Sequence, residues 1–345
     1  GVTIAKETSL EDPEENLGAQ MLRQAAVRTG DTVGDGTSTS TILAHAIFSD
    51  GVRNVVAGAS GIDIKRGLDR GLRIAIDELR NMSTPVKTRE DKLNVATISA
   101  HNDATIGELV ADAMERIGDD GIISVEESKT TETVLEVVEG MQLDRGYISP
   151  YFVTDTAKME AVLEDAYLLL FDSKITNLNE LMSLLDDLVK IGRPIVLIAE
   201  DISGDALATL VVNQIRGVFH SLAVKAPGFG DRRKAILEDI AVLTGAELVS
   251  RELGTSLDTL SLEQLGRAER IVCDKESTII IGGRGEKSNI DARMDQIRNE
   301  IDKTSSDYDK DKLEERLAKL SSGIAVIRVG APSEVEMSSK KEALD

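Results

Sequence analysis

The chain is poor in cysteine, histidine and aromatic residues. Its 345 residues include one cysteine, three histidines and no tryptophan, and aromatic side chains make up only 3% of the sequence. A single cysteine, Cys273, excludes an internal disulfide and favours a reducing compartment. The histidines, His45, His101 and His220, are scattered, so a zinc site is not expected. With so few aromatics, a surface for stacking nucleic-acid bases is not expected either.

Positive charge and long apolar runs are also scarce. The sequence has 40 Lys and Arg against 61 Asp and Glu, which gives a formal net charge of −21. Nucleic acids and anionic membranes require clustered positive charge, so we expect neither as a partner. Because no run of 18 apolar residues and no signal-peptide core occurs, we expect a soluble intracellular protein or a processed organellar chain.

The length and the two ends suggest several domains and a fragment. A chain of 345 residues exceeds one ordinary core, which predicts two or three domains. Residues 1–6 alternate like a strand with no earlier partner, and residues 338–345 stop inside a helical pattern without a cap. We therefore expect this chain to be part of a longer one.

The first third of the chain predicts a helical block. Apolar periodicity indicates helices over residues 14–29, 39–56 and 62–79, with a glycine-rich loop between the first two. The pattern breaks at Met82–Pro85. Mixed helix then covers 93–117, and a strand-like stretch follows over 121–125, which predicts a small linking domain.

From Tyr167 onward the pattern changes to alternating strands and helices. The predicted strands are Tyr167–Phe171, Ile195–Ala199 and Val218–Val224, and the predicted helices between them are Leu178–Lys190 and Asp205–Arg216. This order favours an α/β unit with parallel strands. A charged helix over Tyr308–Leu320 and a strand over Ile324–Val329 follow.

One glycine-rich loop is suited to phosphate. The run Gly34-Asp35-Gly36-Thr37-Ser38-Thr39 precedes an apolar-periodic helix, whose N-terminus supplies partial positive charge and free amides. Asp35 could hold Mg²⁺, which prefers carboxylate, water and phosphate oxygens. The pattern alone fits a turn with a helix cap better.

Other motifs do not predict an enzyme site. The run Gly282–Ser288 has Glu286 directly before Lys287-Ser288, where a Walker motif needs glycine, so it predicts a turn. No Gly-x-Gly-x-x-Gly follows a strand, and no nucleophile elbow occurs. Cys273 fits a packed strand thiol better than a nucleophile.

Two helices have unusually wide apolar faces. On a helical wheel, the apolar residues of 205–216 cover an arc of roughly 200°, and one sheet needs only about half of that. Helix 178–190 is similar. Burial on two sides explains this pattern best, but excess apolar area rimmed by polar residues also suits a groove for unfolded chains.

The run Ala226-Pro-Gly-Phe-Gly-Asp-Arg-Arg-Lys-Ala235 resembles the apical-domain signature of group I chaperonins, the GroEL-type protein-folding machines. Three other segments, Gly34–Thr39, Val138–Phe152 and Glu334–Met337, also match the family in register. The resemblance covers nearly the whole chain. It implies a multidomain fold with a helical part-equatorial block, a small α+β intermediate domain and an apical α/β domain with helices layered on a sheet.

The resemblance also implies domain boundaries. Residues 1–81 correspond to part of the equatorial ATP-binding domain, and residues 82–138 to the intermediate domain. Residues 139–324 correspond to the apical polypeptide-binding domain, and residues 325–345 to the return segment of the intermediate domain.

The resemblance implies that the glycine-rich loop binds ATP and Mg²⁺. Asp35 matches the magnesium-binding aspartate, and Gly36, Thr37, Ser38 and Thr39 match the phosphate contacts, with Ser38 in place of the usual threonine. The family's first phosphate loop and both catalytic carboxylates fall outside Gly1–Asp345. No catalytic residue is therefore expected within the chain, and the chain alone is expected to be inactive as an ATPase.

Eight positions match the family's contacts with non-native polypeptide and the GroES-type co-chaperonin. They are Tyr147, Tyr151, Phe152, Met182, Leu185, Leu207, Val211 and Val212. Met182 replaces the common leucine, and methionine is adaptable enough to serve. Gly140 and Gly323 match the two hinges of the apical domain, with Ser322 where a second glycine is usual.

The function that the resemblance implies is an ATP-dependent folding chaperone. In this family two stacked seven-membered rings capture non-native chains, and ATP-driven hinge motion encloses and releases them. The bacterial cytoplasm, or an organellar matrix or stroma, is the expected location. Two alternatives are a metabolic kinase or dehydrogenase built on residues 167–224, and a passive binding module.

Overall fold

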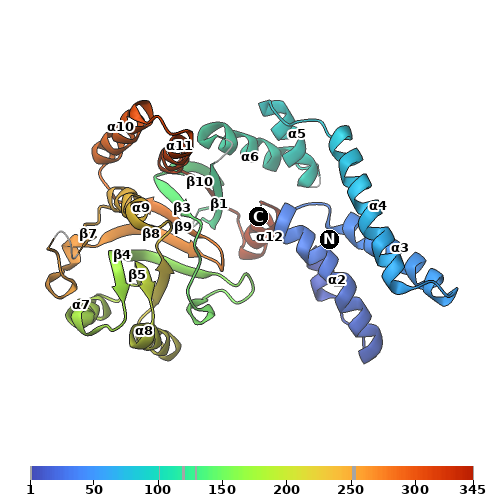
Figure 1. Cartoon of the computed structure of the whole chain (residues 1–345), viewed down its shortest axis with the longest axis horizontal. Helices are drawn as coiled ribbons and strands as arrows, with labels where there is room; N and C mark the ends of the chain where they lie inside the picture. Colours follow the sequence, from blue (N-terminus) through green and yellow to red (C-terminus); the bar gives the residue numbers. More distant parts are fainter. Residues whose placement is uncertain (1, 101, 119–120, 129, 251–253, 345) are drawn as a thin grey trace. The chain divides into compact units, whose positions relative to one another are not determined.

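The computed structural model describes residues 2–100, 102–118, 121–128, 130–250 and 254–344 (Figure 1). The chain divides into two compact units, Gly1–Asn102 and Asp103–Asp345. The described part of the first unit is helical, whereas the second contains helices and two sheets. This confirms the expected multidomain mixture of helical and α/β parts. The four-segment domain division is finer than these two units and stays a prediction.

The described residues of the first unit form five helices. They are α1 (Val2–Glu7), α2 (Pro13–Val33), α3 (Thr37–Val56), α4 (Gly61–Met82) and α5 (Arg89–Ser99). The Asp12 carboxylate caps α2 by accepting bonds from the amides of Glu14 and Glu15. The three predicted helices are confirmed. The predicted strand over residues 1–6 is wrong, because α1 is helical and packs on α2. Six residues are too few to distinguish the two-residue repeat of a strand from the 3.6-residue repeat of a helix.

The first unit has almost no core of its own. Among its described residues Ala26 alone is buried, and neither α3 nor α4 contains a buried residue. Large apolar side chains are exposed instead, including Ile42 at 68%, Phe48 at 69% and Leu72 at 59%. Helices 20 and 22 residues long therefore leave apolar side chains facing solvent.

The second unit contains a small three-stranded sheet, sheet A. Its strands are β1 (Ile122–Glu127), β10 (Ile324–Val329) and β2 (Val134–Val138), and its helices are α6 (Ala104–Ile117) and α12 (Glu334–Leu344). The central strand β10 pairs in parallel with β1 and antiparallel with β2. Ala113 and Ile117 of α6 pack against Ala325 of β10.

The larger sheet of the second unit, sheet B, has the order β3-β9-β8-β4-β5-β6, with β7 pairing β4. Its strands are β3 (Gly140–Leu143), β4 (Ala161–Ile175), β5 (Ile195–Ile202), β6 (Ser221–Lys225), β7 (Leu248–Val249), β8 (Gly266–Cys273) and β9 (Thr278–Gly283). Strands β4, β5 and β6 are parallel, as predicted, whereas β3, β8 and β9 join them through antiparallel pairs.

Helices cover both faces of sheet B. They are α7 (Met182–Ile191), α8 (Gly204–Arg216), α9 (Gly230–Thr244), α10 (Lys287–Lys303) and α11 (Asp307–Ser321). The chain passes from β4 to β5 through α7 and from β5 to β6 through α8, which lie on one face of the sheet, whereas α9 lies on the other. Figure 1 shows this arrangement, with the α10–α11 hairpin beside α9. Helix α7 starts four residues later than predicted, after a 3₁₀ turn at Asn179–Leu181, and β6 starts three residues later.

The core of sheet B follows from this double coverage. Strands β4 and β5 carry continuous apolar runs, and Leu168, Leu170, Ile195 and Leu197 are completely buried. Strands with both faces covered need such runs rather than alternation. This core gives the second unit a stable frame for its surface helices.

The chain crosses between the two sheets at two short connections. Glu139 joins β2 to β3, and Ser322-Gly323 joins α11 to β10. A Cβ at Gly140 would lie 2.4 Å from Ile324 Cδ1 and 2.6 Å from the Ile280 oxygen, so only glycine fits there. Gly323 has a φ of 64°, a left-handed backbone conformation that glycine adopts without steric cost.

Candidate nucleotide and polypeptide sites

The α2–α3 connection places an open helix N-terminus beside a carboxylate. Gly34 ends α2 with a φ of 79°, and Gly36 begins α3 with a φ of 74°, so Asp35 lies between two left-handed residues. Glycine has no side chain with which to cap α3. The first-turn amides of Thr37, Ser38 and Thr39 therefore have no acceptor within the helix. Such an end favours an anion.

Asp35 is exposed, and two nearby groups orient it. Its Oδ1 accepts a hydrogen bond from the Gly36 amide at 2.6 Å, and its Oδ2 accepts one from Ser99 Oγ at 3.2 Å. Ser99 lies at the end of α5, and sequence reasoning missed it because no local pattern connects residues 64 positions apart.

The donor set of this loop fits magnesium bound together with phosphate. Within the described ranges, no group of three or more His, Cys, Asp or Glu residues could hold a metal ion. Mg²⁺ usually keeps several waters and takes one or two carboxylates plus substrate phosphates. One exposed aspartate beside free amides and hydroxyls meets that requirement, and Asp35 would be the metal ligand.

Three of the eight predicted polypeptide contacts are exposed around α7 and α8. Met182 is 49% exposed, Val212 is 43% exposed and Tyr151 is 64% exposed. Tyr151 belongs to a 3₁₀ turn, Pro150–Phe152, that contacts α8. Further exposed apolar side chains on these helices, at Val189, Ile191 and Ile215, extend the set.

The other five predicted contacts lie deeper. Tyr147, Leu207 and Val211 are half-buried and pack against the core of sheet B. Phe152 is completely buried and Leu185 is only 5% exposed, so neither side chain lies on the exposed surface in this structure, and their role as polypeptide contacts stays a prediction. Phe152 belongs to a turn that contacts both α8 and β6, and Leu185 is buried on α7 together with Leu184 and Leu188. The wide apolar arcs are therefore partly core and partly surface.

One ion pair lies on α7 and another joins β5 to β6. Lys190 Nζ donates to Asp187 Oδ1 at 2.8 Å, and this bond raises the pKa of Lys190. Lys225 pairs with Asp201 at 2.7 Å, and this contact lowers the pKa of the Asp201 carboxyl. The Lys190–Asp187 pair is largely exposed and contributes little to stability, whereas the Asp201 side chain is only 25% exposed.

The distinctive run Ala226–Ala235 spans the β6–α9 connection and the first residues of α9. Gly228 and Gly230 have φ values of 81° and 54°, and Phe229 between them is 80% exposed. Arg233 pairs with Glu200 of β5 at 3.3 Å. The loop borders a cavity of about 360 Å³ whose other walls come from α9, α11, β3 and the two residues that follow β3.

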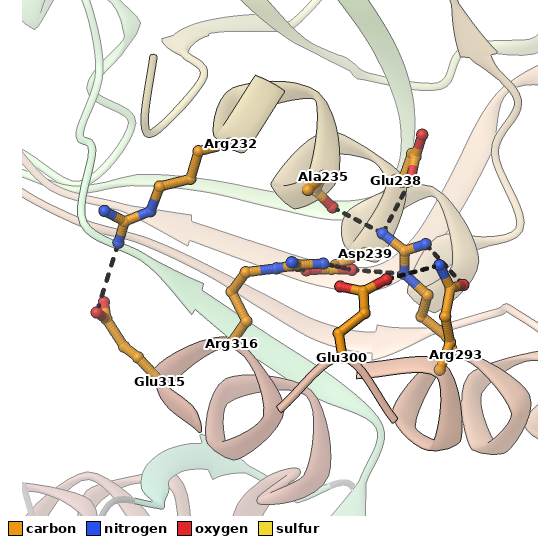
Figure 2. Close-up of polar contacts among 9 residues, drawn as sticks. Arg232, Ala235, Glu238, Asp239, Arg293, Glu300, Glu315 and Arg316 are labelled. Carbon is orange, nitrogen blue, oxygen red and sulfur yellow. Dashed lines mark hydrogen bonds and ion pairs between the residues drawn. The ribbon is translucent and has the colours of Figure 1, made fainter. Parts of the chain in front are cut away.

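A buried carboxylate connects α9 to the α10–α11 hairpin (Figure 2). Asp239 accepts hydrogen bonds from Arg293 Nε at 2.8 Å and from Arg316 Nε and Nη2 at 2.7 and 2.9 Å. Arg293 also donates to the Ala235 oxygen and pairs with Glu238. Two arginines on one buried aspartate fix the hairpin against α9.

Cys273 and the Gly282–Ser288 run lie in a strand and around a short connection between elements. Cys273 is buried in β8, and burial raises the pKa of its thiol to about 12, so it is a packed strand thiol as predicted. Residues 284–286 connect β9 to α10, which confirms a turn. In the described part of the chain, no helix is both long and apolar enough to cross a membrane.

Comparison with known proteins identifies the family. The model of the TCP-1/cpn60 chaperonin family matches residues 1–345. The chain is 69% identical over all its 345 residues to Chaperonin GroEL 5 of Bradyrhizobium diazoefficiens, and it spans 64% of the length of that relative. Since the match to the family model is complete, this chain belongs to the TCP-1/cpn60 chaperonin family.

Proposed function

We propose that this chain is part of an ATP-driven protein-folding chaperone. Apolar side chains around α7 and α8 bind non-native polypeptide, and the same surface binds a co-chaperonin of the GroES type. Nucleotide binds at the N-terminus of α3. Motion at Gly140 and Gly323 then moves the apolar surface and releases the bound chain.

The single observation that carries the proposal is the exposed apolar surface on a well-packed frame. Met182, Val212 and Tyr151 are between 43% and 64% exposed, although sheet B beneath them has a complete core. The core of sheet B therefore forms without burying these three side chains. Exposed and adaptable apolar contacts suit a partner with no fixed sequence.

The loop before α3 supports the nucleotide part of the proposal. Free amides at Thr37, Ser38 and Thr39 and an exposed Asp35 provide donors for phosphate and one ligand for Mg²⁺. Bound Mg²⁺ would neutralise phosphate charge, while the residues of this chain orient the nucleotide.

The two connections between sheets A and B support the hinge. Each is one or two residues long, and Gly323 has the left-handed conformation that tolerates large backbone changes. Assembly into stacked seven-membered rings and a location in the bacterial cytoplasm complete the proposal. They rest on membership of the chaperonin family.

Substitution of the exposed contacts tests the proposal. We expect Met182→Ser and Val212→Ser each to change unfolding free energy by no more than about 0.5 kcal/mol, as at ordinary surface positions. Suppression of aggregation of a denatured test protein should fall several-fold. Thermal melting and light scattering measure the two effects.

Two controls make this result specific. Val95→Ser removes a valine that is 53% exposed on α5, and we expect unchanged capture. Leu210→Ser empties a fully buried position on α8, and we expect a loss of several kcal/mol in stability. Normal capture by stable Met182→Ser and Val212→Ser variants would contradict the proposal.

A further inference from the structure

Sheets A and B are held together by a small apolar contact and a cluster of ion pairs. The apolar contact consists of Ile281 from sheet B and Ile324 and Val326 from sheet A, all buried, with partly buried neighbours. The ion pairs involve two arginines, Arg270 on β8 and Arg328 on β10. Each arginine therefore belongs to a different sheet.

Two carboxylates connect the sheets through these arginines. Arg270 Nη1 of sheet B lies 3.0 Å from Glu126 Oε1 of sheet A, and Arg328 Nη2 of sheet A lies 2.7 Å from Glu269 Oε1 of sheet B. Glu126 also lies 3.7 Å from Arg328 Nε within sheet A. The side chains of Arg270 and Glu126 are only 18% and 14% exposed, so this pair is screened less than a surface pair, whereas Glu269 is 47% exposed and its pair with Arg328 is screened more.

Each arginine has a second carboxylate within its own sheet. Arg270 Nε lies 3.3 Å from Glu164 Oε1 of β4, and Arg328 Nη1 lies 2.7 Å from Glu136 Oε2 of β2. Separation of the sheets would break the contacts with Glu126 and Glu269 across the boundary. Arg270 would keep Glu164 and Arg328 would keep Glu136. Water would replace the lost arginine contacts of Glu126 and Glu269.

We propose that Arg270 and Arg328 form a reversible ionic latch that holds sheet A against sheet B in this conformation. An arginine left without any carboxylate on separation would make opening costly. Here Glu164 and Glu136 retain the arginines on either side, so the contact can open and close repeatedly. The inference rests on the hinge motion proposed above.

The chain contains a matched set of isosteric variants for a test. Glu126→Gln and Glu269→Gln remove carboxylates that act across the boundary, whereas Glu136→Gln and Glu164→Gln remove carboxylates within one sheet. The latch predicts that the two pairs of variants change the open population differently. The first pair should raise the open population, roughly five- to thirtyfold, and the second pair should leave it unchanged or lower it.

Distances between spin labels at Ser338→Cys on α12 and Arg216→Cys on α8 would report the open population in the 345-residue chain. Both positions are exposed, and the native Cys273 is fully buried and should not be labelled. Circular dichroism establishes that each variant is folded. The inference is overturned if the first pair gives the parent's distance distribution, if all four variants open alike, or if no variant shows an open population.

A capture assay run on the same samples separates this inference from the proposed function. If the spin-label distances do not change as predicted but the parent chain captures a denatured test protein normally, only the latch is overturned. A parent chain that captures nothing overturns the proposed function, whatever the distances show.

Discussion

Backbone geometry at single residues determines what the nucleotide loop can do. Gly34 and Gly36 both have positive φ, and together they leave Asp35 projecting beside the uncapped start of α3. The sequence allowed this loop to be recognised because glycines and hydroxyls adjoin a helix. It could not reveal the bond from Ser99, or the burial of Phe152, because both depend on contacts between segments far apart in the chain.

At this residue, we expect Asp35→Ala to abolish the magnesium dependence of nucleotide binding. Removal of Mg²⁺ should weaken binding of ATP to the parent chain at least about tenfold, since unmatched phosphate charge loses its metal. The variant should bind equally weakly with and without the metal. Isothermal titration with ATP in Mg²⁺ or in a chelator measures this.

Asp50→Ala is the control for this measurement, because it removes another exposed aspartate from α3, one that pairs with Arg53 at 3.2 Å. It should behave like the parent chain. A magnesium effect that persists in Asp35→Ala would show that Asp35 only shapes the turn.

At the level of helices and strands, periodicity predicted most elements, and packing decided the rest. The parallel strands β4, β5 and β6 were predictable because continuous apolar runs alternate with amphipathic helices. The wheel of α8 could not distinguish core from surface. Leu210 and Val212 are both apolar, but the first is completely buried and the second is 43% exposed.

The α10–α11 hairpin depends on one carboxylate from another helix. Asp239→Ala should destabilise the second unit by about 3–5 kcal/mol, because it leaves the buried Arg316 without its carboxylate and leaves Arg293 with Glu238 as its one remaining carboxylate partner. Amide exchange should speed up first in α10 and α11, before sheet B. Denaturant unfolding and hydrogen exchange together measure this.

Asp295→Ala provides the comparison on the same hairpin. Its pair with Arg298 is largely exposed, so the unfolding free energy should change by less than about 0.5 kcal/mol. Equal effects of the two substitutions would mean that burial of Asp239 contributes nothing to holding the hairpin.

On the scale of the whole chain, the two units differ in how much core they possess. Nearly all buried side chains of the described ranges belong to Asp103–Asp345, whereas Ala26 is the one example in Gly1–Asn102. The apolar composition of α3 and α4 predicted helices but could not indicate that their apolar side chains would stay uncovered. Burial of a helix depends on the residues that pack against it, and these lie far away in the sequence, where local periodicity does not reveal them.

We therefore expect the first unit to open more readily than the second. Backbone amides of α3 and α4 should exchange with solvent well before those of β4 and β5, since few buried apolar contacts oppose local opening. Hydrogen exchange read by mass spectrometry measures both units in one sample. Similar protection in α3 and β5 would contradict this expectation.

The position of β10 in sheet A has a consequence for the order of folding. Its partner strand β1 lies far earlier in the chain, with Ile122 opposite Ile324. A ribosome must therefore finish all of sheet B before the central strand of sheet A exists. Sheet A closes a very long loop, and pairing across such separations is slow. Until then β1 and β2 emerge without their central partner, so the newly made chain itself exposes unpaired strand edges of the kind that aggregate.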